Sequence, residues 1–407
     1  MPPSAGVISV SDIANSSRVR AALHWLTRER QWLNEKHLDL CRVAAPTFFE
    51  QRRAEWMAEE FRRLGWEAKI DRAGNVIAMR GPDTGHSLIA VTAHLDTVLA
   101  PRSPDDIRVE GGGRFHGPGV SDNGAGLAGL LAIAACAREF DVPGGNSSLL
   151  LVANVGEEGE GNLSGMRYLC KQSPLASRIR AFLVLDGPAT GHITCQALAS
   201  RRFEVSFAGP GGHSWSDYGI GNPAHALARS IHFFTEKQHG EGGPARLPRS
   251  SFNFGVIEGG VSVNSIPSSA RGKLDIRSAS NERLDDLAEL LTACVERSME
   301  VENGRSTGGR VTAKIRELGA RPGGKLPEDA PLLQHLRAVD HFLSIRAQVD
   351  CASTDANIPL SMGLPALSIG AGGHGGGAHT PQEWFHPEGR DIGLRRVLLT
   401  LCMLAND

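Results

Sequence analysis

The amino-acid sequence predicts an α/β protein with a smaller α+β module inserted into it, and three observations lead to this fold class. In the first half of the chain, short apolar runs that suit strands buried on both faces alternate with helical segments. From about residue 201 the order of predicted elements becomes β-α-β-β-α-β, which is that of a ferredoxin-like module. Helical periodicity then returns. We therefore expect one domain built from residues 1–198 and 319–407, and a second, inserted domain at 199–318.

The predicted elements of the first domain follow from apolar periodicity. Apolar residues at three- and four-residue spacing make the first 70 residues helical, and an Ala/Gly/Leu-rich stretch predicts a tightly packed helix. Near-continuous apolar runs predict buried strands. The helices are expected at 19–33, 52–64, 124–140, 331–343 and 389–404, and the strands at 87–93, 147–155 and 181–185.

The inserted module has alternating strands and two amphipathic helices. Asn222 is placed as the N-cap of the first helix, with Pro223 at its first position. The strands are expected at 202–207, 251–257, 270–277 and 310–316, and the helices at 223–237 and 281–301.

Composition excludes several classes of function. Among 407 residues, 43 Lys and Arg face 45 Asp and Glu, and this balance argues against nucleic-acid binding and electrostatic membrane attachment. No apolar run is long enough to span a bilayer, and no secretory signal is visible. The seven cysteines are scattered and form no C-x-x-C pair. We therefore expect buried, unpaired thiols and a cytoplasmic protein.

Glycine is the unusual component, at 48 residues. Such an excess indicates either a flexible chain or many backbone positions where a side chain would obstruct something. The regular apolar runs favour the second explanation.

Polar residues stand where the predicted buried strands end. His94, the Glu157–Glu158 pair and Asp186 each come directly after such a run. Ligands of open α/β sheets bind at this carboxyl edge. Three separate strands ending in metal-ligand types therefore predict a site there.

The first motif residues each have a structural alternative. His94 and Asp96 lie two apart on an extended chain and point the same way, so Asp96 can orient the imidazole for a metal, but the pair alone is more typical of a surface. Asp122 precedes the 124–140 helix, where it is either a capping residue or a carboxylate that bridges two cations.

The Glu157–Glu158 pair is a sharper signal. Two adjacent carboxylates at the end of a buried strand repel each other and are costly to desolvate without a cation. Gly156 and Gly159 permit a turn that aims both at one centre. One carboxylate can then bind a metal while the other serves as general base on a water. The alternative is a solvated turn.

A glycine-rich loop near the C-terminus supplies two histidines, His374 and His379, of which one suffices as a ligand. Together, His94, Asp122, Glu158, Asp186 and His379 offer oxygen and imidazole donors and no thiolate. That set suits two zinc, manganese or cobalt ions sharing Asp122, about 3.5–4 Å apart.

The motifs AHLDT, SDNGAG, GEEGEG, VLDG, GGHS, VNSIP, DIR, STDAN and GAHTPQEW occur in this order. In this set the sequence resembles the dinuclear-zinc metallopeptidases that include peptidase T, carboxypeptidase G, aminoacylase and acetylornithine deacetylase. The resemblance implies a catalytic domain with a mixed sheet covered by helices, and two zinc ions per subunit.

The resemblance also implies a role for each site residue. His94 and Asp186 would hold one zinc, and Glu158 and His379 the other. Asp122 would bridge them next to a cis peptide to Asn123, and Asp96 would orient His94. Glu157 would activate the bridging water and later protonate the leaving amine.

The same resemblance implies that the inserted module is a lid and dimerisation domain. His213 would stabilise the tetrahedral oxyanion, in several family members from the partner subunit. Asn264 and Arg277 would hold the substrate's carboxylate or backbone, although an arginine on an alternating strand is also typical of a surface. The implied partners are a short peptide or N-acyl amino acid and a second copy of the chain, with no nucleic acid and no membrane.

Asp186 discriminates within the family. The matching residue is usually Glu in the deacylases and in carboxypeptidase G, and Asp in peptidase T and related amino- and dipeptidases. We therefore expect an aminopeptidase or dipeptidase. The alternatives are an N-acyl-amino-acid amidohydrolase with the same two-metal mechanism and a non-catalytic metal-binding homologue.

Overall fold

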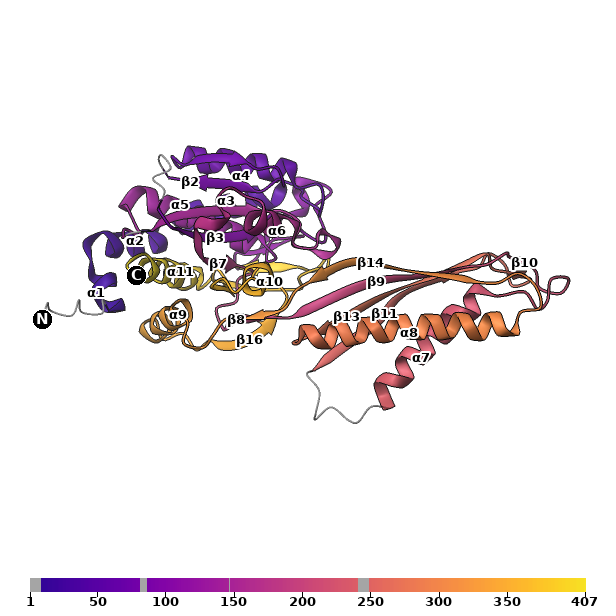
Figure 1. Cartoon of the computed structure of the whole chain (residues 1–407). Coiled ribbons are helices and arrows are strands. Elements are labelled where there is room, and N and C mark those ends of the chain that lie inside the picture. Colours follow the sequence, from indigo (N-terminus) through magenta and orange to yellow (C-terminus); the bar gives the residue numbers. More distant parts are fainter. Residues whose placement is uncertain (1–8, 81–85, 146, 241–248) are drawn as a thin grey trace, which may run out of the picture. The chain divides into compact units, whose positions relative to one another are not determined.

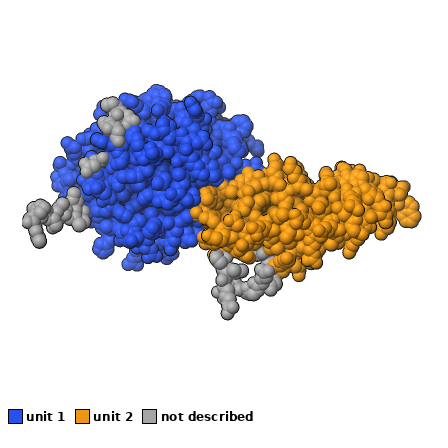
Figure 2. All heavy atoms as spheres, viewed as in Figure 1, with its two compact units in different colours: residues 1–197, 324–407 blue, residues 198–323 orange. Residues whose placement is uncertain are grey.

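The computed structural model describes residues 9–80, 86–145, 147–240 and 249–407. It divides into two compact units (Figure 2). Unit 1 combines the residues up to 197 with those from 324 onward, and unit 2 contains 198–323. The predicted boundary at 318 falls inside the last strand of unit 2, which extends to Arg321.

Unit 1 is built on a nine-stranded mixed sheet in the order β1-β2-β6-β3-β7-β17-β8-β15, with β16 also paired to β8 (Figure 1). Its four central strands β6, β3, β7 and β17 are parallel, and β2 and β8 flank them in antiparallel pairing. This confirms the predicted α/β class with a mixed sheet. The strands are β1 (Glu67–Ile70), β2 (Val76–Met79), β3 (Leu88–His94), β6 (Ser148–Asn154), β7 (Ile179–Leu185), β8 (His192–Ala197), β15 (Gly324–Lys325), β16 (Gln348–Ala352) and β17 (Ala366–Ile369).

The helices of unit 1 cover this sheet. The chain passes from β3 through α5 to β6 on one side of β3, and from β6 through α6 to β7 on the other side. Right-handed crossovers place α5 and α6 on opposite faces of the sheet. The helices are α1 (Val10–Asn15), α2 (Ser17–Arg28), α3 (Arg30–Arg42), α4 (Gln51–Arg63), α5 (Gly124–Phe140), α6 (Ser164–Lys171), α9 (Pro331–Phe342), α10 (Asn357–Ser361) and α11 (Arg390–Ala405), with the short 3-10 turns η1 (Pro104–Asp106), η2 (Gly159–Gly161) and η3 (Ala176–Arg178).

Helix α5 packs unusually close to the sheet. All of its residues from Gly124 to Ala137 are buried. A methyl group on Gly126 would lie 2.3 Å from Asn123 Oδ1 and 2.6 Å from the Leu185 carbonyl oxygen. The glycine therefore lets the first turn of the helix approach the end of β7.

A small second sheet of unit 1 has the order β18-β19-β5-β4 and is antiparallel throughout. It joins the glycine-rich C-terminal loop to the segment before α5. Its strands are β4 (Arg108–Glu110), β5 (Arg114–His116), β18 (His374–Gly376) and β19 (Trp384–His386).

Unit 2 is a four-stranded antiparallel sheet in the order β11-β13-β9-β14, with helices α7 and α8 packed side by side against it (Figure 1). In chain order its main elements run β-α-β-β-α-β, as predicted for a ferredoxin-like module. They are β9 (Ala199–Ala208), α7 (Pro223–Gly240), β11 (Ser250–Gly259), β13 (Ser269–Ser278), α8 (Asn281–Arg305) and β14 (Thr312–Arg321), and the short strands β10 (Gly212–His213) and β12 (Ser265–Ile266) pair separately. The Asn222 side chain accepts the backbone N–H of Ala224 at 2.9 Å, as expected of an N-cap.

Three local predictions were wrong. The helix expected at 19–33 is two helices, α2 and α3, because the backbone leaves the helical region at Glu29, where ψ is 31°. The first 70 residues are not all helical, since β1 occupies Glu67–Ile70. This mostly exposed edge strand carries no apolar alternation. Cys351 is exposed, whereas the other six cysteines are buried as expected.

Among the residues that the structure describes, no helix combines the length and the apolar character needed to cross a membrane.

Because Gly126 lies so close to the sheet, we expect Gly→Ala substitutions at two helical positions, 126 and 304, to change the stability of the protein in opposite directions. Gly126→Ala should lower the thermal unfolding temperature, with a cost of about 1–3 kcal/mol for overpacking. Gly304→Ala in α8 should stabilise by up to about 1 kcal/mol, because an added methyl group there meets no described atom within 4 Å beyond its chain neighbours and the adjoining helix backbone. Calorimetry of both variants checks this, and a Gly126→Ala protein as stable as the wild type would contradict the packing described for α5.

Candidate active site

The carboxyl ends of three neighbouring parallel strands bring the predicted ligands together. His94 ends β3, Asp186 follows β7, and Glu157 and Glu158 come shortly after β6. β3 lies between β6 and β7. The chain runs from β3 to β6 in one direction across the sheet and from β6 to β7 in the other direction, so the strand order reverses here. Ligands of open α/β sheets bind at the carboxyl edge of such a topological switch point.

Asp122 lies at the centre of the cluster, with one carboxylate oxygen directed to each of two imidazoles. Asp122 Oδ1 is 3.1 Å from His94 Nε2, and Asp122 Oδ2 is 3.1 Å from His379 Nε2. His379 Nε2 also lies 2.9 Å from Glu158 Oε1, and His94 Nε2 lies 3.8 Å from Asp186 Oδ1. All five predicted ligands therefore form one contiguous set.

The set contains two groups of three that share Asp122. His94, Asp122 and Asp186 form one, and Asp122, Glu158 and His379 form the other; within each group the ligand atoms lie within 4.8 Å of one another. Imidazole and carboxylate donors without thiolate suit zinc, manganese or cobalt. The residues present thus fit a metal at each group.

The environment of His94 determines which ring nitrogen faces the cluster. Its Nδ1 lies 2.9 Å from the backbone carbonyl oxygen of Asp96, which can only accept, so Nδ1 carries the hydrogen and Nε2 is directed at Asp122. The Asp96 carboxylate is farther away, at 3.5 Å from Nδ1. The main chain of Asp96, more than its side chain, therefore orients the His94 ring.

The Asp96 carboxylate instead holds the loop that carries the two glutamates. Its oxygens accept the backbone N–H groups of Glu157 at 3.0 Å and Glu158 at 2.8 Å, and the hydroxyl of Thr47 at 3.0 Å. Gly156, at φ +67°, permits the turn between β6 and this loop. Both glutamates are buried, at 6% exposure, and donor atoms of both lie within reach of His94. The solvated turn is thereby excluded.

The pKa values of the cluster show how strongly it attracts positive charge. Burial lowers the pKa of the His94 ring, but the neighbouring carboxylates of Asp122, Asp186 and Asp96 outweigh burial and hold the pKa well above the ordinary value. The bond to Asp122 raises the pKa of His379 to about 9. Burial raises the pKa of Glu158. These carboxylates therefore favour any neighbouring cation.

His379 and His374 differ in their surroundings. His379 joins the cluster with its backbone at φ +65°, in the left-handed region that few non-glycine residues adopt. His374 lies in β18 opposite His386, is exposed, and belongs to none of the three donor groups found in the described part of the chain.

His213 and Asn264 lie together in unit 2. β10 and β12 pair His213 with Ser265, and the Asn264 carbonyl accepts the N–H of Ser214 at 3.0 Å. His213 Nδ1 accepts the backbone N–H groups of Trp215 and Ser216 at 3.3 and 3.4 Å. Nε2 therefore carries the ring hydrogen, and the exposed imidazole is a hydrogen-bond donor.

Arg277 lies at the opposite end of the unit 2 sheet. On β13 it pairs with Ser200, whereas Ser269, near the His213 segment, pairs with Ala208. Eight residues of strand separate the two ends, which corresponds to about 27 Å. Arg277 Nε donates to Asp275 Oδ2 at 2.7 Å. Within one copy of unit 2, the structure does not bring Arg277 close to His213 and Asn264.

Sequence reasoning assigned no role to three buried residues around the cluster. The Asn123 side chain accepts the N–H groups of Gly126 and Gly187, and it donates to the Leu185 carbonyl. The peptide bond between Asp122 and Asn123 is cis, as the resemblance implied. Asp355 accepts from Asn154 Nδ2 at 2.6 Å, and burial raises its pKa to about 7. Glu383 binds the segment before Asp122. Their only sequence signal is membership of the SDNGAG, STDAN and GAHTPQEW motifs.

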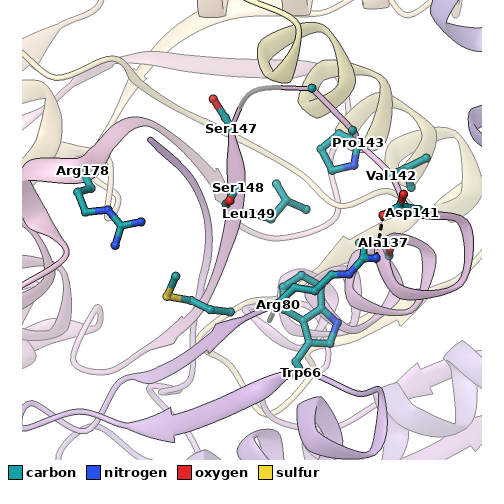
Figure 3. Close-up of a pocket in the computed structure, with 13 residues that line it drawn as sticks. Trp66, Arg80, Ala137, Asp141, Val142, Pro143, Ser147, Ser148, Leu149 and Arg178 are labelled. Atoms are coloured by element: carbon teal, nitrogen blue, oxygen red, sulfur yellow. Dashed lines mark hydrogen bonds and ion pairs between the residues drawn. The ribbon is translucent and has the colours of Figure 1, made fainter. Parts of the chain in front are cut away.

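A cavity of about 160 Å³ at the other end of the sheet is separate from this site (Figure 3). It lies where β6 and β7 begin, between Trp66, Leu149 and Arg178, and Arg80 beside it is paired with Asp141 at 2.7 Å. None of the predicted site residues lines it.

An α/β unit with imidazole and carboxylate donors at its switch point, joined to a ferredoxin-like unit, defines the class of two-domain metal-dependent hydrolases. Residues 90–401 match the family described as "Peptidase family M20/M25/M40", and the chain belongs to this family. It is an enzyme of metal-dependent amide-bond hydrolysis.

Curated relatives align over most of their length. The chain is 26% identical over 350 residues to acetylornithine deacetylase of Photorhabdus laumondii, covering 82% of this chain and 84% of that protein. It is 28% identical over 337 residues to succinyl-diaminopimelate desuccinylase of Corynebacterium glutamicum, covering 81% and 85%.

Solved structures share the fold. A tripeptidase of Staphylococcus aureus superposes with a TM-score of 0.75 at 20% identity, covering 93% of this chain and 99% of that one. The aminopeptidase PepT of Bacillus cereus gives a TM-score of 0.72 at 19% identity, covering 92% and 99%. Both likenesses confirm the predicted fold class.

Proposed function

We propose that the protein hydrolyses amide bonds of short peptides, as an aminopeptidase or dipeptidase, with two zinc ions held by His94, Asp122, Glu158, Asp186 and His379. The observation that carries this proposal is the position of Asp122, whose two oxygens face two separate donor groups. Two cations sharing one carboxylate lower the pKa of a water and polarise the scissile carbonyl when they are bound. Manganese or cobalt suits the same donors.

Glu157 is the general base of the proposed reaction. It lies in the donor group formed with His94 and Glu158, and its backbone is fixed by Asp96. Its carboxylate takes a proton from the water that adds to the carbonyl carbon, and then returns that proton to the leaving amine as the C–N bond breaks. While they hold cations, Asp122 and Glu158 stay ionised and His94 stays neutral, with its hydrogen on Nδ1.

His213 supplies the oxyanion donor. Because its Nδ1 accepts two backbone N–H groups, its Nε2–H is directed outward and can bond the carbonyl oxygen as negative charge develops there. By the same resemblance, Asn264, in the same loop pair, and Arg277 would hold the substrate's carboxylate or backbone.

A second candidate is an N-acyl-amino-acid amidohydrolase. The names of the curated relatives favour it, since both act as deacylases by those names. Asp186 favours the peptidase, because the resemblance places Asp here in amino- and dipeptidases and Glu in deacylases.

Hydrolysis of matched substrates distinguishes the two. The metal-loaded enzyme is given a panel of unblocked di- and tripeptides and the same amino acids carrying N-acetyl or N-succinyl groups. We expect turnover only where a free α-amine is present. Turnover restricted to the acylated amino acids would replace the peptidase by the amidohydrolase, and no turnover of either set would refute both.

Replacing the base separates chemistry from metal binding. Glu157→Gln should retain the cations and lower kcat by at least about 10²-fold, which is typical for loss of a general base. Metal content and turnover are measured on the same preparation, with Glu160→Gln, an exposed glutamate of the same segment, as control. Unchanged turnover in Glu157→Gln would show that another group is the base.

The distance between His213 and Arg277 favours a dimer. An extended tripeptide spans about 10 Å, far less than the length of strand between the two residues. If both contact one substrate, they come from different copies of unit 2. An apolar groove of about 380 Å³ beside the edge strand β11, lined by Leu227, Ile231 and Ile257, offers a surface for a second copy.

Mixed dimers test whether His213 acts across the interface. Glu157→Gln and His213→Ala protomers are co-expressed with different tags, and the doubly tagged dimers are purified. Each mixed dimer then has one site with both an intact base and an intact donor, so its activity should be roughly half that of the wild-type dimer. Activity no higher than that of the two single variants would place His213 and Glu157 of the same chain at one site.

A further inference from the structure

Glu383 binds the backbone of the segment that ends in Asp122. Its Oε2 accepts the N–H of Gly119 at 2.8 Å, and its Oε1 accepts the N–H groups of Ser121 at 2.8 Å and Asp122 at 2.9 Å. Glu383 is 3% exposed. One buried carboxylate thus accepts hydrogen bonds from three backbone N–H groups within the four-residue segment 119–122. Hydrogen bonds to a charged acceptor are stronger than those between neutral groups.

The main chain of Glu383 is itself anchored to the same region. It directly precedes β19, which pairs with β5, and its carbonyl oxygen accepts the N–H of Gly117 at 3.1 Å. Since β5 leads into the segment of residues 117–122, the small sheet holds Glu383 and its target in register. Glu383 also lies only four residues after His379, so one loop both supplies His379 and fixes Asp122.

The carbonyl groups of the segment are bound from the other side. His37 Nδ1 lies 2.7 Å from Arg390 Nη2, which can only donate, so His37 Nε2 carries the ring hydrogen and donates to the Val120 carbonyl at 2.8 Å. The Gly119 carbonyl accepts the N–H of Gly124 at 2.9 Å. The backbone before Asp122 therefore has partners on both its N–H and C=O groups.

We propose that Glu383 is a positioning residue that holds the Asp122 carboxylate between His94 and His379 before any cation binds. Glu383 contacts neither a cation nor a substrate in this scheme, and it acts only through the backbone of residues 119–122. The inference rests on the proposed role of Asp122 as the shared ligand. Partners outside the ligand shell of a metal typically change its affinity by about 10–100-fold when they are removed.

The variant Glu383→Gln is the most direct test, because it preserves size and removes one acceptor. Two of the three N–H groups can still bond the amide oxygen, but the remaining one then faces an NH₂ group. We expect zinc affinity, measured by titration of metal-depleted full-length protein against a competing chelator, to fall about 10–100-fold. We also expect faster amide hydrogen exchange in the fragment that contains residues 119–122, measured without metal.

Asp340→Asn is the matched control for general destabilisation. Asp340 is a buried carboxylate of the same unit, and both its oxygens accept from Arg396 at 2.6 Å. It belongs to none of the donor groups found in the described residues. This variant should unfold at a lower temperature and keep its zinc affinity. If Glu383→Gln does not fold, Glu383→Asp, which keeps the charge but is one methylene shorter, decides the question.

The outcomes separate this inference from the proposed function. Wild-type zinc affinity and wild-type exchange in a folded Glu383 variant would overturn the positioning role. An equal loss of zinc affinity in Asp340→Asn would also overturn it, since general stability would then explain the effect. A wild-type protein that binds no zinc would refute the two-cation site, while the exchange measurement would still test whether Glu383 fixes the segment.

Discussion

The repulsion among clustered carboxylates, some buried and some half-buried, is the constraint on which the active-site region depends. Asp96, Asp122, Glu157, Glu158 and Asp186 converge on one edge of the sheet, and Asp355 lies buried nearby. Like charges at this density are costly to bury unless hydrogen bonds and positive charge offset them. The raised pKa values of His94 and His379 are the direct expression of that requirement, because each imidazole retains a proton more strongly among these carboxylates.

The fold meets this requirement with backbone N–H groups as well as with ligands. Asp96 is bound by the N–H groups of Glu157 and Glu158, and Glu383 by those of Gly119, Ser121 and Asp122. In both cases the bound backbone belongs to a segment that presents a further carboxylate to the cluster. Asp96 and Glu383 lie outside the donor groups that share Asp122, and each of them thus fixes the backbone of a segment that carries carboxylates of the cluster. The glycine excess contributes to the same arrangement, since Gly126 lets α5 approach β7 and Gly156 turns the chain after β6.

Much of the fold and the cluster could be predicted because the signals are local. Apolar runs that end in His94, Glu157 and Asp186 identify buried parallel strands and their carboxyl edge together, and the helix 124–140 was predicted with its observed bounds. β1 was missed because an exposed edge strand carries no apolar pattern, and the break at Glu29 because the helical periodicity continues across it. The role of Glu383 depends on hydrogen bonds to residues more than 260 positions away, which spacing cannot show. Likewise, only the register of β13 on β9 reveals that Arg277 and His213 lie at opposite ends of one sheet.

The central claim is that Asp122 is shared by two cations, one beside His94 and Asp186 and the other beside Glu158 and His379. Anomalous diffraction at the zinc absorption edge, from crystals of the full chain grown with zinc, tests it most directly. The expected result is two peaks about 3.5–4 Å apart, one on either side of the Asp122 carboxylate. A single peak, or peaks that do not contact Asp122, would contradict the shared-ligand site.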